Sequence, residues 1–397
     1  MHYRTLKLKI SCSNSDRNRL RLCNEESAKV WNHCIELNAE SFNSNKTILK
    51  KNELYSGTKK FITQIICSNN KRTVCNRVYD AFKAIMKARG SRKELNYPYK
   101  KKKYYPTEWD NQFMNINYLK NTILLTAVRY VGDDGKKHNG KQIRIWFKFR
   151  LPENIKTLKL LYEHGNYYAC LSYTVEVKNR EVSSDIYSAI DLGEIHSITS
   201  IDNHQNQLII TGRKIRSIKQ LRNKKQAELR SKMDKCEKFS RRYCKLRIAL
   251  SKIKSKSRRQ LDYHIHKLTR MYTNWVIEKG ISLVYCGDVT GIGYNTSSKG
   301  SSITRQKINQ WEYGKIMSLL EYKLELDGIQ FRKVNEAYSS QICPSCSMRN
   351  KPKKRNYSCL NCKGSFHRDI VGAWNILNFN HKLNFTPNKT LKYLRIS

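Results

Sequence analysis

The architecture of the C-terminal half is set by IYSAIDLGEIHSITSIDNHQNQLIITG, residues 186–212. This segment contains three short runs of apolar and β-branched residues separated by turn residues, a pattern that predicts three successive strands. Two further strands are predicted downstream, at SLVYCGD (residues 282–288) and IQFRKV (residues 329–334), with a helix between them. The segment therefore begins an α/β domain, in which Asp191 ends the first strand.

The chain is strongly basic. Its 397 residues include 77 Lys and Arg against 32 Asp and Glu, which gives a formal net charge of +45. A compact protein with this excess needs a polyanionic partner to offset the repulsion between its own charges, and nucleic acid is the natural candidate. The 24 Tyr and 11 Phe residues exclude wholesale disorder, and the length predicts roughly two to four domains.

A membrane or secreted protein is not expected. No apolar run approaches the roughly 20 residues that span a bilayer, and the N-terminal sequence MHYRTLKLKISCS lacks the apolar core of a secretory signal. The 13 cysteines comprise four that are tightly paired and others that are scattered, which indicates reduced thiols with one metal site. We therefore expect no membrane partner and a cytoplasmic location in a prokaryote, or a nuclear one in a eukaryote.

A cysteine module lies near the C-terminus. The sequences CPSC and CLNC place Cys343, Cys346, Cys359 and Cys362 in two pairs with twelve residues between the pairs. Four thiolates at this spacing predict one tetrahedral, structural Zn²⁺ with no open coordination position. The basic residues between the pairs form either a basic face or a solvated loop; they are Lys351, Lys353, Lys354 and Arg355.

Four carboxylates lie at the ends of predicted elements. Asp191 and Asp369 are the first candidates for catalysis, although the first also suits a turn and the second a helix N-cap. Hydrolysis with two metal ions requires a third carboxylate. Either Asp288 or Glu336, each at the end of a predicted strand, meets that requirement. Three histidines are interpreted as ordinary surface or packing residues: His196, His204 and His367.

Six motifs occur in order along the chain: AIDLG, YCGDVTGI, QKINQWEYGKI, VNEAYSSQICPSC, CLNC and FHRDIVGAWNI. This series resembles the TnpB family of transposon-encoded nucleases, which are related to the compact type V CRISPR effectors and to the eukaryotic Fanzors. The resemblance covers residues 186–380, whereas in the first 185 residues only the order of the element types agrees.

The resemblance implies a multidomain α/β fold. Its parts are an RNase H-like RuvC nuclease domain with an inserted four-cysteine zinc ribbon, and an N-terminal β-barrel, the wedge domain, interrupted by a helical recognition domain. The implied boundaries are 1–14 with 107–185 for the wedge, 15–106 for the recognition domain, 186–340 with 366–384 for the nuclease, 341–365 for the ribbon and 385–397 for a C-terminal tail.

The resemblance also implies an RNA-guided DNA endonuclease. Such an enzyme binds a guide RNA (omega RNA) encoded by its own element, with one protein copy per RNA favoured. It pairs this guide with double-stranded target DNA as a heteroduplex and cuts beside a short flanking motif. Asp191, Glu336 and Asp369 would hold two Mg²⁺, with Mn²⁺ as an alternative, while Asp288 helps to hold the site. Glu336 is preferred over Asp288 because relatives with the same Gly-Asp sequence are thought to use a Glu further downstream.

Other activities remain open at this stage. A nuclease-dead, RNA-guided repressor and a compact type V CRISPR effector both fit the resemblance. A DNA-strand transferase is a third alternative, but we expect no pairing of a Tyr nucleophile with the His-hydrophobic-His metal motif that such an enzyme needs.

Three segments are candidate nucleic-acid contacts. YPYKKKKYYP, residues 97–106, interleaves lysines with tyrosines that can stack on bases, and the alternative is a solvated linker. The basic helical stretch 213–280 has few acidic residues at a spacing of four, so contact is favoured over a solvated face. The loop 294–307 has the composition of a lid over the nuclease cleft. The candidate residues are Tyr97, Tyr99, Lys100, Lys101, Lys102, Lys103, Tyr104, Arg213, Arg216 and Arg305.

Overall fold

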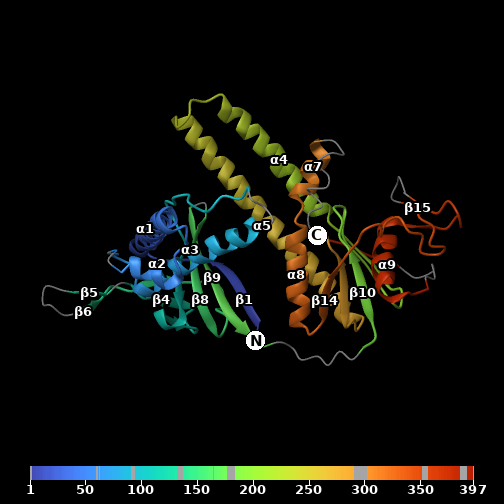
Figure 1. The fold of residues 1–397 in the computed structure, drawn as a ribbon, viewed down its shortest axis with the longest axis horizontal. Coiled ribbons are helices and arrows are strands. Elements are labelled where there is room, and N and C mark those ends of the chain that lie inside the picture. The colour runs from blue at the N-terminus through green and yellow to red at the C-terminus, as the bar shows by residue number, and fades with distance from the viewer. Residues whose placement is uncertain are drawn as a thin grey trace. The chain divides into compact units, whose positions relative to one another are not determined.

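The computed structural model of the chain divides into two compact units, Met1–Val175 and Glu176–Ser397, and each is described by itself (Figure 1). The residues that the structure describes are 2–59, 61, 63–90, 94–127, 129–131, 137–163, 165–176, 184–289, 302–350, 356–384 and 391–396. Across these ranges, no helix combines the length and the apolar character needed to cross a bilayer.

The strands of the first unit form antiparallel sheets. The alternating residues of β1 (His2–Lys9) pair with β9 (Asn166–Val175), far along the chain, in a four-stranded sheet of order β1-β9-β8-β2. The other strands are β2 (Thr107–Asp110), β3 (Met114–Asn117), β4 (Thr122–Leu125), β5 (Arg129–Val131), β6 (Lys137–Asn139), β7 (Ile143–Trp146) and β8 (Ile155–Glu163). Strands β3, β4 and β7 form a second sheet, and a bridge between Ser11 and Trp146 links it to the chain beyond β1. The closed barrel stays a prediction.

Three helices are inserted between β1 and β2, as the apolar spacing of residues 15–90 predicts. They are α1 (Asn14–Asn45), α2 (Lys51–Gly57) and α3 (Ser68–Arg89). The buried carboxylate of Glu26 on α1 accepts hydrogen bonds from the backbone N–H groups of Gln64, Ile65 and Ile66 at 2.7, 3.0 and 3.0 Å. Because these donors precede α3, the carboxylate fixes the start of α3 on α1.

The second unit is built on a six-stranded mixed sheet with the order β14-β13-β10-β11-β12-β17. Its strands are β10 (Tyr187–Asp191), β11 (His196–Asp202), β12 (Gln207–Thr211), β13 (Leu283–Gly287), β14 (Gln330–Val334) and β17 (Leu391–Arg395). Strands β10, β11 and β12 are antiparallel neighbours, which confirms the three strands predicted from residues 186–212. Strands β13 and β14 continue the sheet in parallel from β10.

The prediction of a separate C-terminal tail at residues 385–397 is wrong for the part that the structure describes. Leu391–Arg395 form β17, which pairs in parallel with β12 and extends the sheet. This strand lies at the sheet edge with most of its side chains exposed. An exposed edge strand of this kind lacks the apolar alternation that identifies a half-buried strand.

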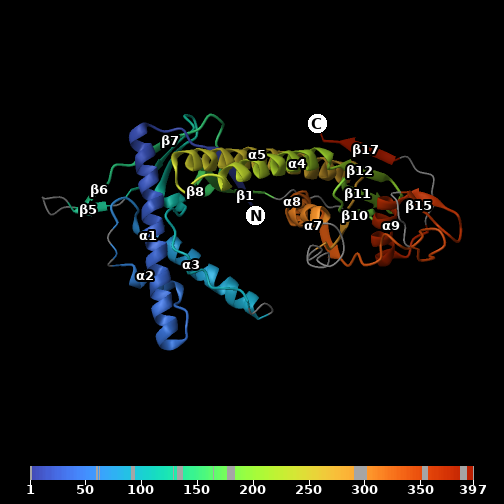
Figure 2. The same ribbon diagram turned by 90° about the horizontal axis from the view of Figure 1, so that it is seen from above.

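Helices cover both faces of this sheet (Figures 1 and 2). On one face, α9 (Arg368–His381) packs Ile370, Ala373 and Trp374 against a cluster that includes Ala189 and Tyr285. On the other face lie α5 (Arg241–Glu278) and α8 (Tyr313–Leu326), with α4 (Arg213–Asp234) beside α5. The helices α4 and α5 run side by side and extend beyond the sheet. The remaining elements are α7 (Ser302–Gln310), β15 (Asn356–Ser358) and β16 (Ser365–His367).

Candidate functional site

Three acidic residues come together at one edge of the second sheet because their strands are parallel. Asp191 is the last residue of β10, Asp288 follows β13 directly, and Glu336 lies two residues beyond β14. The three strands are neighbours in the order β14-β13-β10. Their carboxyl ends therefore meet at the same edge of the sheet.

Gly287, the last residue of β13, makes room for Glu336. A Cβ atom at position 287 would lie 2.4 Å from Glu336 Oε2 and 3.0 Å from Glu336 Cβ, which is closer than side chains approach one another. Glu336 is half-buried at this position, whereas Asp288 is exposed. The glycine thus lets an acid from β14 lie across the end of β13.

Helix α9 brings Asp369 to the same place. A Cβ atom at Gly372 would lie 2.6 Å from Asp191 Oδ2, so the helix backbone approaches the Asp191 carboxylate closely. Asp369 lies in the first turn of α9, three residues before Gly372 and therefore on the same side of the helix. The predicted alternative role for Asp369, a helix N-cap, is wrong, because His367 occupies the N-cap position.

Mutual repulsion marks this group of carboxylates, which we call the acid cluster: Asp191, Glu336 and Asp369. Burial, and then the negative charges of Asp369 and Glu336, raise the pKa of Asp191 to about 8, while Arg368 acts in the opposite direction. Burial, followed by the charge of Asp288, also raises the pKa of Glu336. A group of acids that disfavour one another's ionisation is a candidate for metal binding or catalysis.

Three neighbours of the acid cluster were not predicted: His196, His367 and Tyr313. The interpretation of His196 as an ordinary histidine is wrong, because its Nδ1 lies 2.7 Å from Asp369 Oδ2 in an almost fully buried position. The ring of His367 lies 5.1 Å from the ring of His196. Tyr313, at the start of α8, is also close, since burial and then the charge of Asp191 raise its pKa. His204, by contrast, is exposed as predicted.

The four cysteines of the predicted zinc module converge. The Sγ atoms of Cys343 and Cys362 are 3.6 Å apart, those of Cys346 and Cys359 are 3.5 Å apart, and all four lie within 4.8 Å of one another. Thiolates that bind Zn²⁺ at about 2.3 Å in a tetrahedron have this separation. A backbone hydrogen bond involving Met348 lowers the pKa of the Cys346 thiol to about 6, which favours the thiolate that a metal requires.

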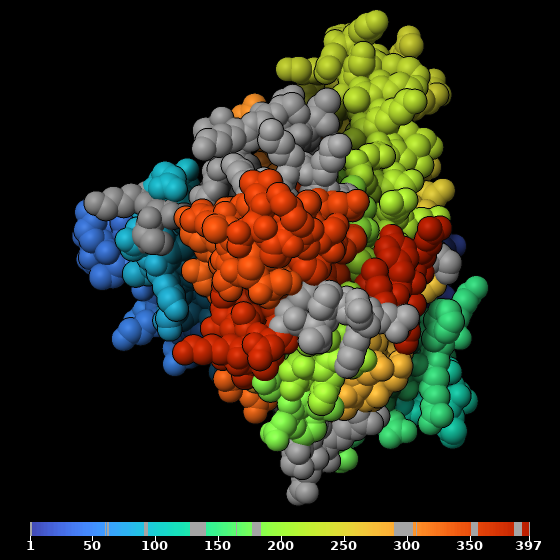
Figure 3. Space-filling view, turned by 90° about the vertical axis from the view of Figure 1, so that its right-hand side faces the viewer, coloured from blue at the N-terminus to red at the C-terminus, as the bar shows by residue number. Residues whose placement is uncertain are grey.

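Helix α9 carries the cysteine module as well as Asp369. Val371 belongs to the same buried cluster as Cys343, Tyr357 and Cys359. The side-chain amide of Asn375 donates to the backbone carbonyls of Ser339 and Ile342 at 2.5 and 2.8 Å. The module, coloured orange-red, occupies the centre of the face in Figure 3. The predicted basic residues Lys351, Lys353, Lys354 and Arg355 lie outside the described residues.

Part of the segment 97–106 packs within the first unit. The Tyr97 ring stacks on Phe82 with centroids 5.7 Å apart, and Lys102 Nζ lies 3.3 Å from the centroid of the Trp31 ring. Lys101 forms an ion pair with Glu36 at 2.7 Å. The residues of the segment that are exposed are Tyr99, Lys100, Lys101, Lys103 and Tyr104. A surface for a partner therefore remains, although Tyr97 and Lys102 also hold the segment in place.

The other predicted contact residues differ in their exposure to solvent. Arg213 is exposed at the start of α4, whereas Arg216 is half-buried and its Nε pairs with Glu194 at 3.2 Å. Arg305 is exposed on α7. The loop 294–307 lies outside the described residues for its first eight positions.

A His-hydrophobic-His sequence does occur, contrary to expectation, at His264-Ile265-His266, directly after Tyr263. These residues lie inside α5, where side chains two positions apart point in nearly opposite directions. Because His264 and His266 cannot converge on one ion from there, the tripeptide does not form the metal site of a strand transferase.

Two family models match the second half of the chain: "Cas12f1-like, TNB domain" over residues 313–376 and "Probable transposase" over residues 170–293. A TnpB-like protein of Methanocaldococcus jannaschii is 26% identical over 192 residues, which are 47% of this chain and 66% of that protein. The predicted resemblance to the TnpB family is confirmed. A solved complex of Cas12f1 with sgRNA and target DNA shares the fold, with a TM-score of 0.69 at 14% identity over 94% of this chain and 98% of that one.

The first prediction concerns the cysteine module of this chain. We expect about one zinc ion per chain, and loss of that ion in Cys359→Ser, because three thiolates leave the tetrahedron incomplete. Metal analysis of protein purified under reducing conditions measures the content. Cys236→Ser, a half-buried cysteine outside the module, is the control and should keep its zinc. Full zinc occupancy in Cys359→Ser would contradict the assignment.

The second prediction follows from the pKa of Asp191. A carboxyl whose pKa rises from about 3.9 in the unfolded chain to about 8 in the folded one binds its proton more tightly when folded, so it lowers stability as the pH rises between those values. In buffer without added Mg²⁺ or Mn²⁺, Asp191→Asn should therefore be more stable than the parent chain at pH 9, by about 1–3 kcal/mol.

That difference should shrink towards zero below about pH 3, where Asp191 is mostly protonated in both states. Urea unfolding across this pH range measures it. The exposed residue Asp185 in the same unit offers a control, Asp185→Asn, for which we expect little change. A stability difference for Asp191→Asn that does not vary with pH would contradict the electrostatic account.

Proposed function

We propose that this chain is an RNA-guided DNA endonuclease that cleaves by metal-dependent hydrolysis of a phosphodiester. The observation that carries the proposal is the acid cluster, in which burial and like charges raise the pKa of Asp191 to about 8. Acids held together in this way are a candidate site for cation binding or acid–base catalysis, and a bound cation would relieve their repulsion. The likeness in fold to a Cas12f1 complex with guide and target supports the same reading.

The acid cluster fits divalent cations. Carboxylate oxygens are the ligands that Mg²⁺ and Mn²⁺ prefer, and Gly287 and Gly372 leave the space that two carboxylates occupy. Asp191, Glu336 and Asp369 would hold two Mg²⁺, with Mn²⁺ as an alternative. Bound there, the cations would supply the activation of a water molecule and the stabilisation of the leaving oxygen.

The protein's own residues set the positions of the three acids. Strand β10 and the backbone at Gly372 confine Asp191, and the space at Gly287 admits Glu336. His196 bonds to one oxygen of Asp369, and this contact restrains the orientation of that carboxylate. We assign the third ligand to Glu336, since Asp288 is exposed, and we give Asp288 the role of an adjacent charge that raises the pKa of Glu336.

The proposed partners are a guide RNA from the chain's own element, an omega RNA, and double-stranded DNA that forms a heteroduplex with it beside a short flanking motif. The net charge of +45 suits neutralisation of many phosphates. In this proposal, residues 15–106 recognise nucleic acid, the N-terminal sheets form a wedge-like barrel, and residues 186–340 with 366–384 form a RuvC-like nuclease. One chain would bind each RNA, in a prokaryotic cytoplasm or a eukaryotic nucleus.

The third prediction separates cleavage from binding. The RNA that copurifies with the chain is sequenced, and a plasmid carrying the matching sequence serves as target. Asp191→Ala and Glu336→Ala should each lower the cleavage rate by at least about a hundredfold while target binding is kept. Asp288→Ala is the matched control and should retain most of the cleavage activity. Plasmid nicking and gel-shift assays measure the two properties.

Different results would point elsewhere. Full cleavage by Asp191→Ala would refute the endonuclease proposal. Loss of cleavage in Asp288→Ala with normal cleavage in Glu336→Ala would show that the third ligand has been assigned to the wrong strand. Target binding without cleavage by the parent chain, in both Mg²⁺ and Mn²⁺, would indicate a repressor.

The fourth prediction concerns His196. Without its bond to Asp369, the carboxylate can rotate away from the cluster, so His196→Ala should raise the Mg²⁺ concentration needed for half-maximal cleavage by about tenfold. The rate at saturating Mg²⁺ should change much less, and His196→Asn, which keeps a donor, should recover part of the loss. The exposed His204 supplies the control His204→Ala. An equal loss of rate at every Mg²⁺ concentration would indicate a purely structural role.

A further inference from the structure

A concave, positively charged pocket lies on the second unit, apart from the acid cluster. Its volume is about 400 Å³. Residues of α4, α5 and the start of α8 line it: Arg222, Gln226, Lys254, Ser257, Arg258, Leu261, Asp262, Glu312 and Lys315. Four of these residues are cationic and two are acidic, so the lining carries an excess of positive charge.

The base of the pocket is formed by residues that lie along one side of each long helix. On α5, Lys254, Ser257 and Leu261 are separated by three and four residues and so lie along one side of the helix. On α4, Arg222 and Gln226 have the same relation. Ser257 and Leu261 are almost fully buried, at 6% and 3% exposure, which places them at the base of the pocket with the cations around them.

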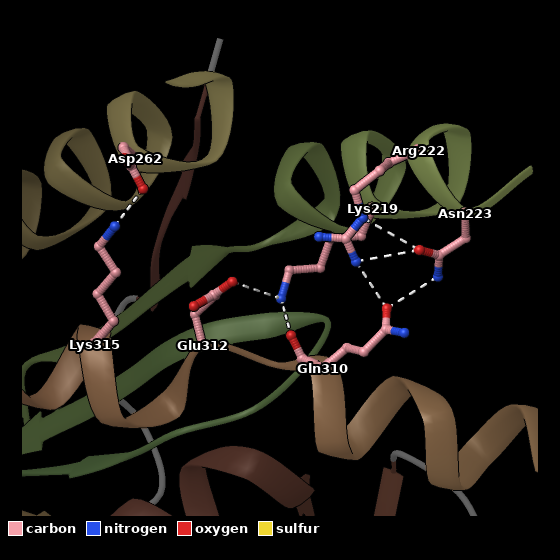
Figure 4. Close-up of polar contacts among 7 residues, drawn as sticks. All are labelled: Lys219, Arg222, Asn223, Asp262, Gln310, Glu312 and Lys315. Atoms are coloured by element: carbon pink, nitrogen blue, oxygen red, sulfur yellow. Dashed lines mark hydrogen bonds and ion pairs between the residues drawn. The ribbon is translucent and has the colours of Figure 1, made fainter. Parts of the chain in front are cut away.

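The acids of the pocket are already engaged. Lys315 pairs with Asp262, and Lys219, a buried residue of α4, pairs with Glu312 at 3.5 Å (Figure 4). Arg222 donates to the side-chain oxygen of Gln310 at 2.8 Å. These contacts hold α8 and the end of α7 to the long helices. They also pair both acids of the lining with cations.

Among the described residues, three cations of the lining form no ion pair with a carboxylate, and one of them, Arg222, is held instead by the side chain of Gln310. No ion pair joins Lys254 or Arg258 to a carboxylate anywhere in the ranges that the structure describes. Both residues are exposed at the rim of the pocket, four positions apart on α5. The first turn of α8, which borders the pocket at Lys315, adds the positive end of a helix dipole. An anion is therefore the ligand that this pocket favours.

We propose that the pocket binds one unpaired nucleotide of the RNA partner. Its volume is within the range of about 300–1,000 Å³ that accepts small organic ligands, and it cannot hold a duplex. Lys254 and Arg258 would contact the phosphate, Ser257 and Gln226 offer hydrogen bonds to a 2′-hydroxyl or a base edge, and Leu261 offers an apolar contact. This inference rests on the proposed function only in taking RNA as the partner.

The fifth prediction compares two double variants of the full chain. Lys254→Ala with Arg258→Ala removes the unpaired cations of the pocket. Lys252→Ala with Lys256→Ala is the matched control, because these lysines are exposed on the same helix at the same spacing and do not line the pocket. The probes are a labelled RNA hairpin with one bulged uridine, the same hairpin fully paired, and a DNA hairpin with the same bulge. Fluorescence anisotropy at fixed salt measures the affinities.

We expect the pocket variant to bind the bulged RNA about tenfold more weakly and the paired RNA within about twofold of the parent chain, while the control variant changes all probes alike and slightly. Equal losses in the two variants, or no loss in either, would overturn the pocket. An equal loss for the bulged DNA would overturn the assignment to RNA. None of these measurements involves cleavage. A result against the nucleotide pocket therefore does not affect the endonuclease proposal, and a result against cleavage does not affect the pocket.

Discussion

The second unit is organised around a crowded group of negative charges. Asp191, Glu336 and Asp369 approach one another at the end of a sheet, and burial with this crowding raises the pKa of Asp191 to about 8. The approach depends on two residues without side chains, because a Cβ atom at Gly287 or Gly372 would lie 2.4 or 2.6 Å from a carboxylate oxygen. A side chain at either glycine would collide with a carboxylate and displace it from the cluster. The sheet and α9 together therefore impose a cost that a bound cation would relieve.

Helix α9 connects this group to the cysteine module. Its first turn carries Asp369 and its backbone meets Asp191 at Gly372, while Val371 and Asn375 face the module. The remaining apolar side chains of the helix pack on the sheet. One short helix thus contacts the acid cluster, the cysteine module and the sheet, so a zinc ion bound by the module would also help to fix the position of Asp369. In the proposed enzyme, the module would contribute to the chemistry through this support, without an open metal position of its own.

The sequence predicts features that depend on local pattern and misses those that depend on contacts between distant residues. Strands β10 to β14, the cysteine module and the three acids follow from periodicity, spacing and motif order. The bond between His196 and Asp369 joins residues 173 positions apart, and no local pattern marks a histidine that lies beside an acid only after folding. The packing of Tyr97 on Phe82 was missed for the same reason, whereas the edge strand β17 was missed because its exposed residues lack apolar alternation. For the third acid, strand-end pattern alone leaves Asp288 and Glu336 open, the resemblance implies Glu336, and Gly287 leaves room for the Glu336 side chain.

The rest of the unit uses its few acids to lock basic helices in place. Glu312 and Asp262 pair with Lys219 and Lys315, which join α8 to α4 and α5, whereas Lys254 and Arg258 form no ion pair within the described residues. Cations on such a surface have two roles. Those in ion pairs set the shape of the pocket, and in our proposal those at the rim without ion pairs contact the phosphate of the nucleotide. A strongly basic surface attracts nucleic acid wherever it is exposed. A pocket on that surface can still select one phosphate, because its shape, rather than the net charge, decides which phosphate fits.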